Sequence, residues 1–240
     1  MKIIAHKSIK YDYFTFLREN INNPKITGVA FDIVMTKDKK VIIYTPYGDY
    51  ISTIDALQSN TYENLKNIDI IPLEETLRFF SRSNKKIIIN LLPIVSPPTD
   101  EETLFNVNRL NEEYVNAVNI IISKFPTLEF YICSAYDNLV FQMKRLNHNY
   151  KVGFIITNLS TNYIDVDFYA FTTNMIDKKI IDQQLNINKE VMIYIINCDD
   201  MNMIMNNFSK EQFYYPNIKN TFNEIFFINN YPTIFWNIFN

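Results

Sequence analysis

The stretch GVAFDIVMTKDKKVIIYTP, residues 28–46, decides the fold. Its first part, Val29–Val34, is an apolar run without strict alternation, which is typical of a strand buried on both faces of a parallel sheet. The charged stretch Lys37–Lys40 predicts a solvated turn, and Val41–Tyr44 predicts a second strand that returns as a hairpin. The segment therefore predicts a buried strand with an appended hairpin, and Asp32 is the one acidic residue inside the buried run.

Working outward from this strand, seven further apolar runs of the same kind occur along the chain. They are Lys2–Ala5, Ile87–Leu92, Leu128–Ser134, Val152–Ile156, Val166–Phe171, Val191–Ile196 and Ile225–Ile228. Helical spacing or helix-start signals predict helices in four of the segments outside these runs. The predicted helices are Pro72–Arg82, Leu104–Ile121, Asp137–Leu146 and Asp199–Asn207.

Strand and helix alternation repeated eight times in 240 residues predicts an α/β fold, the (β/α)8 TIM barrel. We expect one domain over residues 1–240, with a small hairpin and loop insertion after the second strand that runs through Asn60.

Composition narrows the class of protein. A hydrophobic content of 48% with 20% charged residues indicates a globular chain. The net charge of −3 argues against nucleic-acid binding, which needs clustered basic residues. No apolar run approaches the roughly 18 residues of a transmembrane helix, and MKIIAHKS lacks the apolar length of a signal peptide. We therefore expect a cytoplasmic protein whose two cysteines, Cys133 and Cys198, are reduced and buried.

Several segments, in chain order, resemble the glycerophosphodiester phosphodiesterase family of phosphoric diester hydrolases. IIAHKS at Ile3–Ser8 resembles the family's first strand, which ends in His-Arg-Gly. Residues 28–46 resemble its second strand, Gly-hydrophobic-Glu-hydrophobic-Asp-Val, and the following strand that ends in His-Asp-Pro. The other matching segments are IPLEETLRFF (Ile71–Phe80), IIINLLPI (Ile87–Ile94), YICSAYDNL (Tyr131–Leu139), VMIYIINCDDMNMIM (Val191–Met205) and IFFINNYP (Ile225–Pro232). The resemblance spans nearly the whole chain and implies the same barrel.

The resemblance also implies a chemistry from lipid metabolism. In this family two histidines act as general acid and base, and about three carboxylates hold a divalent ion that withdraws charge from the phosphoryl oxygens. His6 stands at the first histidine, and Lys7 replaces the arginine that grips phosphate. Lys7 is therefore either a phosphate contact or a surface charge.

Most of the other positions have changed. Ala30 replaces the glutamate of the Glu-x-Asp pair, and Asp32 keeps the aspartate as a candidate metal ligand. Tyr44 replaces the second catalytic histidine, and Leu92 stands where the third strand carries a glutamate. A further family acid, from a Pro-Glu-Asn-Thr segment, falls on Asp12 by its distance from Asp32, whereas Arg18–Asn20 matches it by letters; we take Asp12 as the candidate ligand.

Two further positions complete the comparison. Asn197 is retained on the seventh strand as a candidate substrate contact. His148 lies late in a predicted helix that runs toward the opposite end of the barrel, so it does not replace the missing histidine.

These changes favour a catalytically degenerate barrel, a pseudoenzyme with a non-enzymatic binding, scaffold or regulatory role and no cofactor. The alternative is an active Mg²⁺- or Ca²⁺-dependent enzyme with a rearranged site built from His6, Lys7, Asp12 and Asp32. It would hydrolyse glycerophosphodiesters to sn-glycerol 3-phosphate and an alcohol. The aromatic segment YPTIFWNIFN is expected to pack on the barrel wall, with docking on a protein partner or self-association as the alternative.

Overall fold

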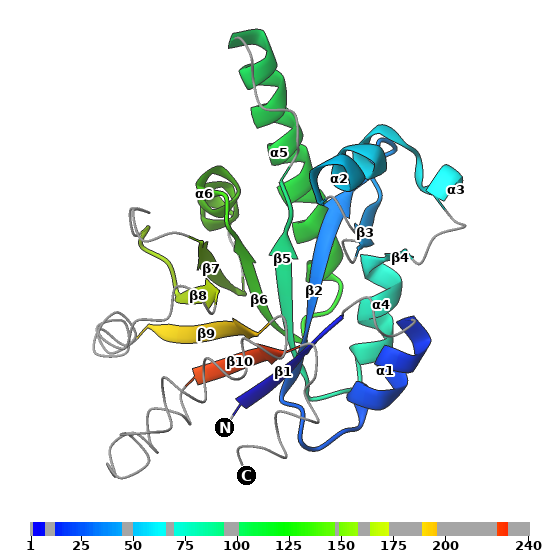
Figure 1. Ribbon diagram of the computed structural model, residues 1–240, viewed down its shortest axis with the longest axis vertical. Helices are drawn as coiled ribbons and strands as arrows, with labels where there is room; N and C mark the ends of the chain where they lie inside the picture. Colours follow the sequence, from blue (N-terminus) through cyan, green and yellow to red (C-terminus); the bar gives the residue numbers. More distant parts are fainter. Residues whose placement is uncertain are drawn as a thin grey trace.

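The computed structural model describes residues 2–7, 13–44, 50–65, 70–93, 101–146, 149–157, 164–172, 189–195 and 225–229. Figure 1 shows strands that surround a common axis, with helices on their outer side. The strands are β1 (Lys2–His6), β2 (Gly28–Met35), β3 (Val41–Ile43), β4 (Ile71–Pro72), β5 (Lys86–Leu91), β6 (Glu129–Ser134), β7 (Lys151–Ile156), β8 (Phe168–Thr172), β9 (Glu190–Ile195) and β10 (Ile225–Asn229). The helices are α1 (Tyr13–Ile21), α2 (Tyr50–Ser59), α3 (Tyr62–Leu65), α4 (Leu73–Phe80), α5 (Glu101–Ser123) and α6 (Asp137–Arg145).

Eight parallel strands close into a barrel. The order β1-β2-β5-β6-β7-β8-β9-β10 returns to β1, where Ala5 lies opposite Val29 of β2 on one side and Asn229 of β10 on the other. All eight predicted strands are present, and the predicted TIM barrel is confirmed.

The hairpin after the second barrel strand is also confirmed, because β3 runs antiparallel to β2 and β4 extends it. The expectation of a loop through Asn60 was wrong, since α2 occupies Tyr50–Ser59. Ile54 and Leu57 of α2 are buried against the hairpin. Isoleucine and threonine weaken the helix signal of this segment, and burial of its apolar face compensates.

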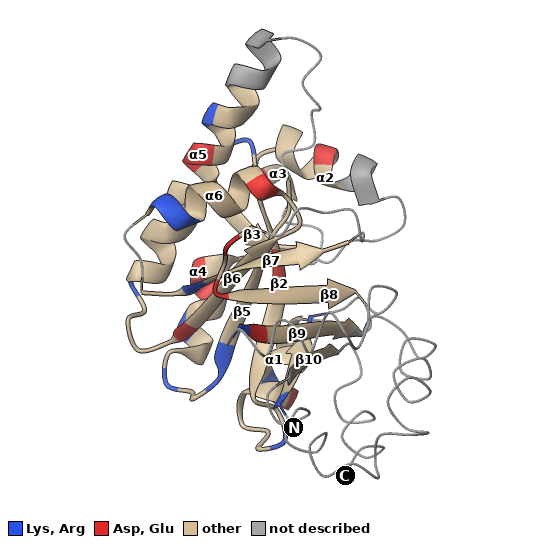
Figure 2. Cartoon of the chain, turned by 90° about the vertical axis from the view of Figure 1, so that its left-hand side faces the viewer, with Lys and Arg blue, Asp and Glu red and all other residues tan. Residues whose placement is uncertain are grey.

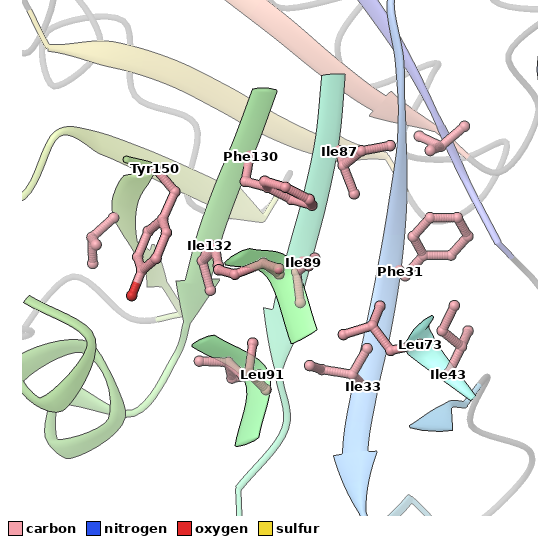
Figure 3. Packing of buried hydrophobic residues seen from close by; sticks show 14 of the residues in the cluster. Phe31, Ile33, Ile43, Leu73, Ile87, Ile89, Leu91, Phe130, Ile132 and Tyr150 are labelled. Atoms are coloured by element: carbon pink, nitrogen blue, oxygen red, sulfur yellow. The ribbon is translucent and has the colours of Figure 1, made fainter. Parts of the chain in front are cut away.

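The helices cover the outer face of the barrel. Alternate strand residues such as Phe31, Ile89 and Ile132 form one apolar cluster with them, and Figure 3 shows this layer across β2, β5 and β6. The predicted helices Pro72–Arg82, Leu104–Ile121 and Asp137–Leu146 are confirmed as α4, α5 and α6. The predicted helix Asp199–Asn207 lies outside the described residues.

On each barrel strand, the residues that alternate with this outer apolar layer point inward and fill the barrel interior. Ile88, Phe168 and Met192 are among a second apolar cluster there. Gly153 is the residue that makes room for the Phe168 ring, because a Cβ atom on it would stand 2.2 Å from that ring. The interior is therefore packed with side chains rather than open.

Charged residues gather where the barrel strands begin (Figure 2). The Lys151 ammonium lies 2.7 Å from the Glu190 carboxylate, and Lys86 pairs with Glu129. The hydroxyl of Tyr131, which is fully buried, donates to Glu129 at 2.8 Å and accepts from both lysines at 3.2 Å. We call these five side chains the basal network.

None of the helices among the described residues combines the length and apolar character that a membrane crossing requires.

Candidate functional site

Three polar side chains meet inside the barrel at the carboxyl ends of β1, β2 and β5. Nε2 of His6 lies 3.2 Å from Oδ2 of Asp32. Nδ2 of Asn90 donates a hydrogen bond of 2.7 Å to Oδ1 of the same carboxylate. Because each oxygen of Asp32 faces a different partner, the three residues form one clamp across three strands, which we call the His6–Asp32–Asn90 clamp.

Strand register brings the clamp together. Asp32 and Asn90 are direct neighbours on β2 and β5, and His6 lies opposite Ala30 on β1 and β2. The carboxylate is almost buried, with 8% of Asp32 exposed, so it needs hydrogen-bonding partners in place of water. Asn90 supplies one such hydrogen bond, and Nε2 of His6 approaches the other oxygen at ion-pair distance without the geometry of a hydrogen bond. The 16% exposure of the His6 side chain keeps this end of the barrel in contact with solvent.

Cys133 of β6, which lies opposite Asn90, and Tyr194 of β9 complete this layer. The ring of Tyr194 stands edge-on to His6 with 6.2 Å between centroids, and its hydroxyl lies 3.8 Å from Sγ of Cys133. Burial raises the pKa of Cys133 to about 12, the nearby Asp32 charge adds to the rise, and the Tyr194 hydroxyl opposes it. Cys133 is thus a buried thiol, as expected, and at neutral pH it is not a nucleophile.

Lys7 follows the clamp histidine in the chain. Only 3% of Lys7 is exposed, so the alternative of a solvated surface charge was wrong. Its backbone N–H donates to the carbonyl of Ala30 at 3.0 Å, which holds the end of β1 against β2. A contact between Lys7 and a phosphate stays a prediction.

Tyr44 and Leu92, which replace a catalytic histidine and an acid in the resemblance, both lie in a third apolar cluster. They are 4% and 2% exposed, and they pack with Val34, Ile42 and Ile54 between the hairpin and α2. The backbone N–H of Tyr44 donates to the carbonyl of Asp32 at 3.0 Å, so the hairpin is fastened directly beside the clamp.

Asn90 is the residue that sequence comparison missed. It is the one polar side chain in the apolar run Ile87–Leu92, and that was the available signal. Matching by letters placed the acid of the third strand at Leu92, whereas register places Asn90 beside Asp32.

The described residues do not fit a hard divalent cation. Such an ion takes several oxygen ligands, usually including more than one carboxylate. No group of three His, Cys, Asp or Glu side chains among the described residues could hold a metal ion. Ala30, opposite His6, contributes a methyl group to the interior cluster where the resemblance expects a glutamate. Asp12, Asn197 and His148 lie outside the described residues.

Comparison with solved structures finds the same barrel fold in several phosphodiesterases. A putative glycerophosphodiester phosphodiesterase from Galdieria sulphuraria superimposes with a TM-score of 0.70 at 14% identity, covering 99% of this chain and 96% of that one. A glycerophosphodiester phosphodiesterase from Parabacteroides distasonis gives 0.69 at 14% identity, covering 99% and 95%. An Oleispira antarctica phosphodiesterase in complex with the product sn-glycerol-3-phosphate gives 0.67 at 13% identity, covering 100% and 97%.

No protein-family model and no curated protein sequence matches the chain. At these identities the structural likeness shows the fold, a barrel shared along the full length of both chains.

Proposed function

We propose that this chain is a glycerophosphodiester phosphodiesterase-like barrel that no longer hydrolyses phosphodiesters and serves as a binding, scaffold or regulatory protein. One observation carries the proposal. The candidate metal ligand Asp32 is engaged by His6 at one oxygen and by Asn90 at the other.

The clamp replaces what a metal ion would do for Asp32. A buried carboxylate must be compensated, and a divalent ion shared with other carboxylates is one way to do so. Here the Asn90 amide donates a hydrogen bond to one oxygen, and the His6 imidazole, which would pair with the carboxylate when protonated, lies 3.2 Å from the other. An incoming ion would have to displace the Asn90 amide and would gain only one carboxylate among the described residues.

The side chains at three other positions of the family's site support the same proposal. Ala30 is 1% exposed within the interior cluster, and Leu92 and Tyr44 are buried in the cluster beneath the hairpin. Each of these three positions holds a side chain that packs in an apolar cluster. The residues that replace the acids and the histidine are therefore part of the core. Apolar packing at three such positions stabilises the barrel at the expense of the family's chemistry.

The ordered sequence resemblance and the full-length structural likeness support the origin of the barrel. Both point to glycerophosphodiester phosphodiesterases, the first through His6, Asp32 and their surrounding segments, the second through shape. A ligand retained from that origin would be a phosphate ester bound near His6.

The second candidate is an active phosphodiesterase with a rearranged site. The observation that favours it is the His6–Asp32 pair itself, because a carboxylate beside an imidazole orients it for proton transfer. In this alternative Lys7 and Asp12 would assist in binding the phosphate or the metal ion.

The deciding experiment is turnover of glycerophosphocholine by the purified chain with Mg²⁺, Ca²⁺ or Mn²⁺, measured as released sn-glycerol 3-phosphate. We expect the rate of the wild-type chain to equal that of His6→Ala with every ion. Metal-dependent turnover that His6→Ala abolishes, while Phe141→Ala on the exposed face of α6 retains it, would establish the active alternative instead.

A further inference from the structure

Two exposed phenylalanines flank the seam between helices α1 and α4. Phe14 of α1 is 62% exposed and Phe79 of α4 is 50% exposed. The helices lie side by side in Figure 1, and the Tyr13 hydroxyl donates to Oγ1 of Thr76 across the seam. Because each helix precedes a parallel barrel strand, the two helices run in the same direction.

On α4, the flank that carries Phe79 faces α1. Glu74 pairs with Lys124, which directly follows α5, so that side of α4 faces α5. Glu75 and Phe79 lie four residues apart, and therefore form one stripe, on the other flank. This flank presents an acid and an aromatic ring to solvent.

On α1, the matching stripe carries the opposite charge. Tyr13, Phe16 and Leu17 mark the buried side of the helix. Phe14 and Arg18, again four residues apart, share the stripe at the edge turned toward α4. The stripe on α1 therefore carries an aromatic ring and a positive charge. The stripe on α4 carries an aromatic ring and a negative charge.

Among the described residues, the Arg18 and Glu75 charges have no partner. Arg18 and Glu75 are exposed, and no hydrogen bond or ion pair joins either side chain to another residue in the part of the chain that the structure describes. Glu74, by contrast, contacts both Arg78 and Lys124.

We infer that the α1–α4 seam is an isologous interface with a second copy of this chain. A two-fold axis that lies in the interface plane and is perpendicular to these helices sets each helix antiparallel to its own copy, and α1 of one subunit then meets the partner's α4, also antiparallel, diagonally across the seam. In an antiparallel pair, Phe14 opposite the partner's Phe79 places Arg18 opposite the partner's Glu75, because each charge is four residues away in the matching direction. The symmetry repeats both contacts.

Charge complementarity between the two stripes favours a second copy of this chain as the binding partner. An aromatic centre with a charged rim is the usual composition of a protein interface. The rim charges of the two stripes match each other in sign and spacing, so the surface is complementary to itself. The interface does not depend on whether the barrel hydrolyses a substrate. The result of the turnover assay therefore neither supports nor contradicts it.

Sedimentation equilibrium of the full chain between about 1 and 100 µM tests the interface, since transient dimers dissociate in this range. The expected result is a monomer–dimer equilibrium. Phe79→Glu should weaken it at least about a hundredfold, because each dimer loses two central aromatic contacts. Phe141→Glu, an equally exposed site on α6, should leave it unchanged.

The charge pair gives the sharper test. Arg18→Glu or Glu75→Arg alone should raise the dimer dissociation constant about tenfold, since two rim pairs become repulsive. The double variant Arg18→Glu/Glu75→Arg should return close to the wild-type value. A wild-type chain that is monomeric at every concentration overturns the inference, as does a dimer that Phe79→Glu leaves intact or a double variant without rescue.

Discussion

The two ends of the barrel interior use their polar residues differently. At the start of the strands, four charged side chains surround the Tyr131 hydroxyl in the basal network. At the carboxyl ends, the described strand residues contribute one inward carboxylate, Asp32, held in the His6–Asp32–Asn90 clamp. Barrel enzymes carry their chemistry at the carboxyl ends and their stabilising contacts at the other. This contrast is what the proposed function predicts, with the stabilising end of the barrel kept and the chemical end reduced.

The largest effect is expected from filling the interior above the basal network. Gly153→Ala should lower the free energy of unfolding by about 3 kcal/mol, because the new methyl group would overlap the Phe168 ring. Chemical denaturation measures it. Phe168→Leu in the same chain should recover part of the loss, and a Gly153→Ala variant as stable as wild type would show that the interior is not tightly packed there.

The next prediction concerns the carboxyl end of the barrel, where carboxylates can be introduced beside Asp32. Ala30→Glu with Asn90→Asp should set three carboxylates around one point together with Asp32. We expect this variant to be less stable than wild type without metal, and to gain about 1.4–2.7 kcal/mol in Mn²⁺ at 10 to 100 times its Kd.

The melting temperature with and without Mn²⁺ checks this prediction. Asn90→Asp alone, with two carboxylates, is the matched control and should respond less. A triple-carboxylate variant that ignores Mn²⁺ would show that positions 30, 32 and 90 do not converge.

At the basal network, Tyr131→Phe should cost about 1–2 kcal/mol of unfolding free energy, because it removes the hydroxyl that joins two lysines and two carboxylates. Urea denaturation measures the loss. Tyr136→Phe, whose ring is exposed, should be neutral. Equal effects of the two substitutions would contradict a stabilising role for the network.

The smallest effect concerns pH. Burial opposes ionisation of Glu129, but hydrogen bonds from Lys86 and Tyr131 outweigh it and hold the pKa of Glu129 below its ordinary value of 4.5. A lowered pKa contributes stability that is present above pH 4.5 and is lost as the pH falls through the folded-state pKa. Thermal unfolding of Glu129→Gln should therefore depend less on pH below 4.5 than that of wild type. An unchanged slope would argue against the contribution of this pair.

Much of the fold was predictable, because the signal is local. Each barrel strand is a separate apolar run, and the long helix α5 has regular spacing, so both were predicted. The helix α2 was missed, because YISTIDALQS is rich in residues of weak helix propensity and its stability comes from burying Ile54 and Leu57.

The site was less predictable, because it depends on register. His6 and Asp32 were identified from their motifs, yet their direct pairing and the part played by Asn90 follow from which residues face each other on β1, β2 and β5. A sequence shows that Asn90 is polar within an apolar strand; only the paired strands show that it faces Asp32.

The most direct test of the central claim is the melting temperature of the wild-type chain with and without 10 mM Mn²⁺ or Ca²⁺, run beside the turnover assay. If the clamp has replaced the metal site, neither ion should move the melting temperature by more than about 1 °C, because no native-state binding stabilises the fold. A rise of about 4 °C or more, equivalent to at least about 1 kcal/mol for a chain of this size, would mean that an ion binds and that the site retains its metal chemistry.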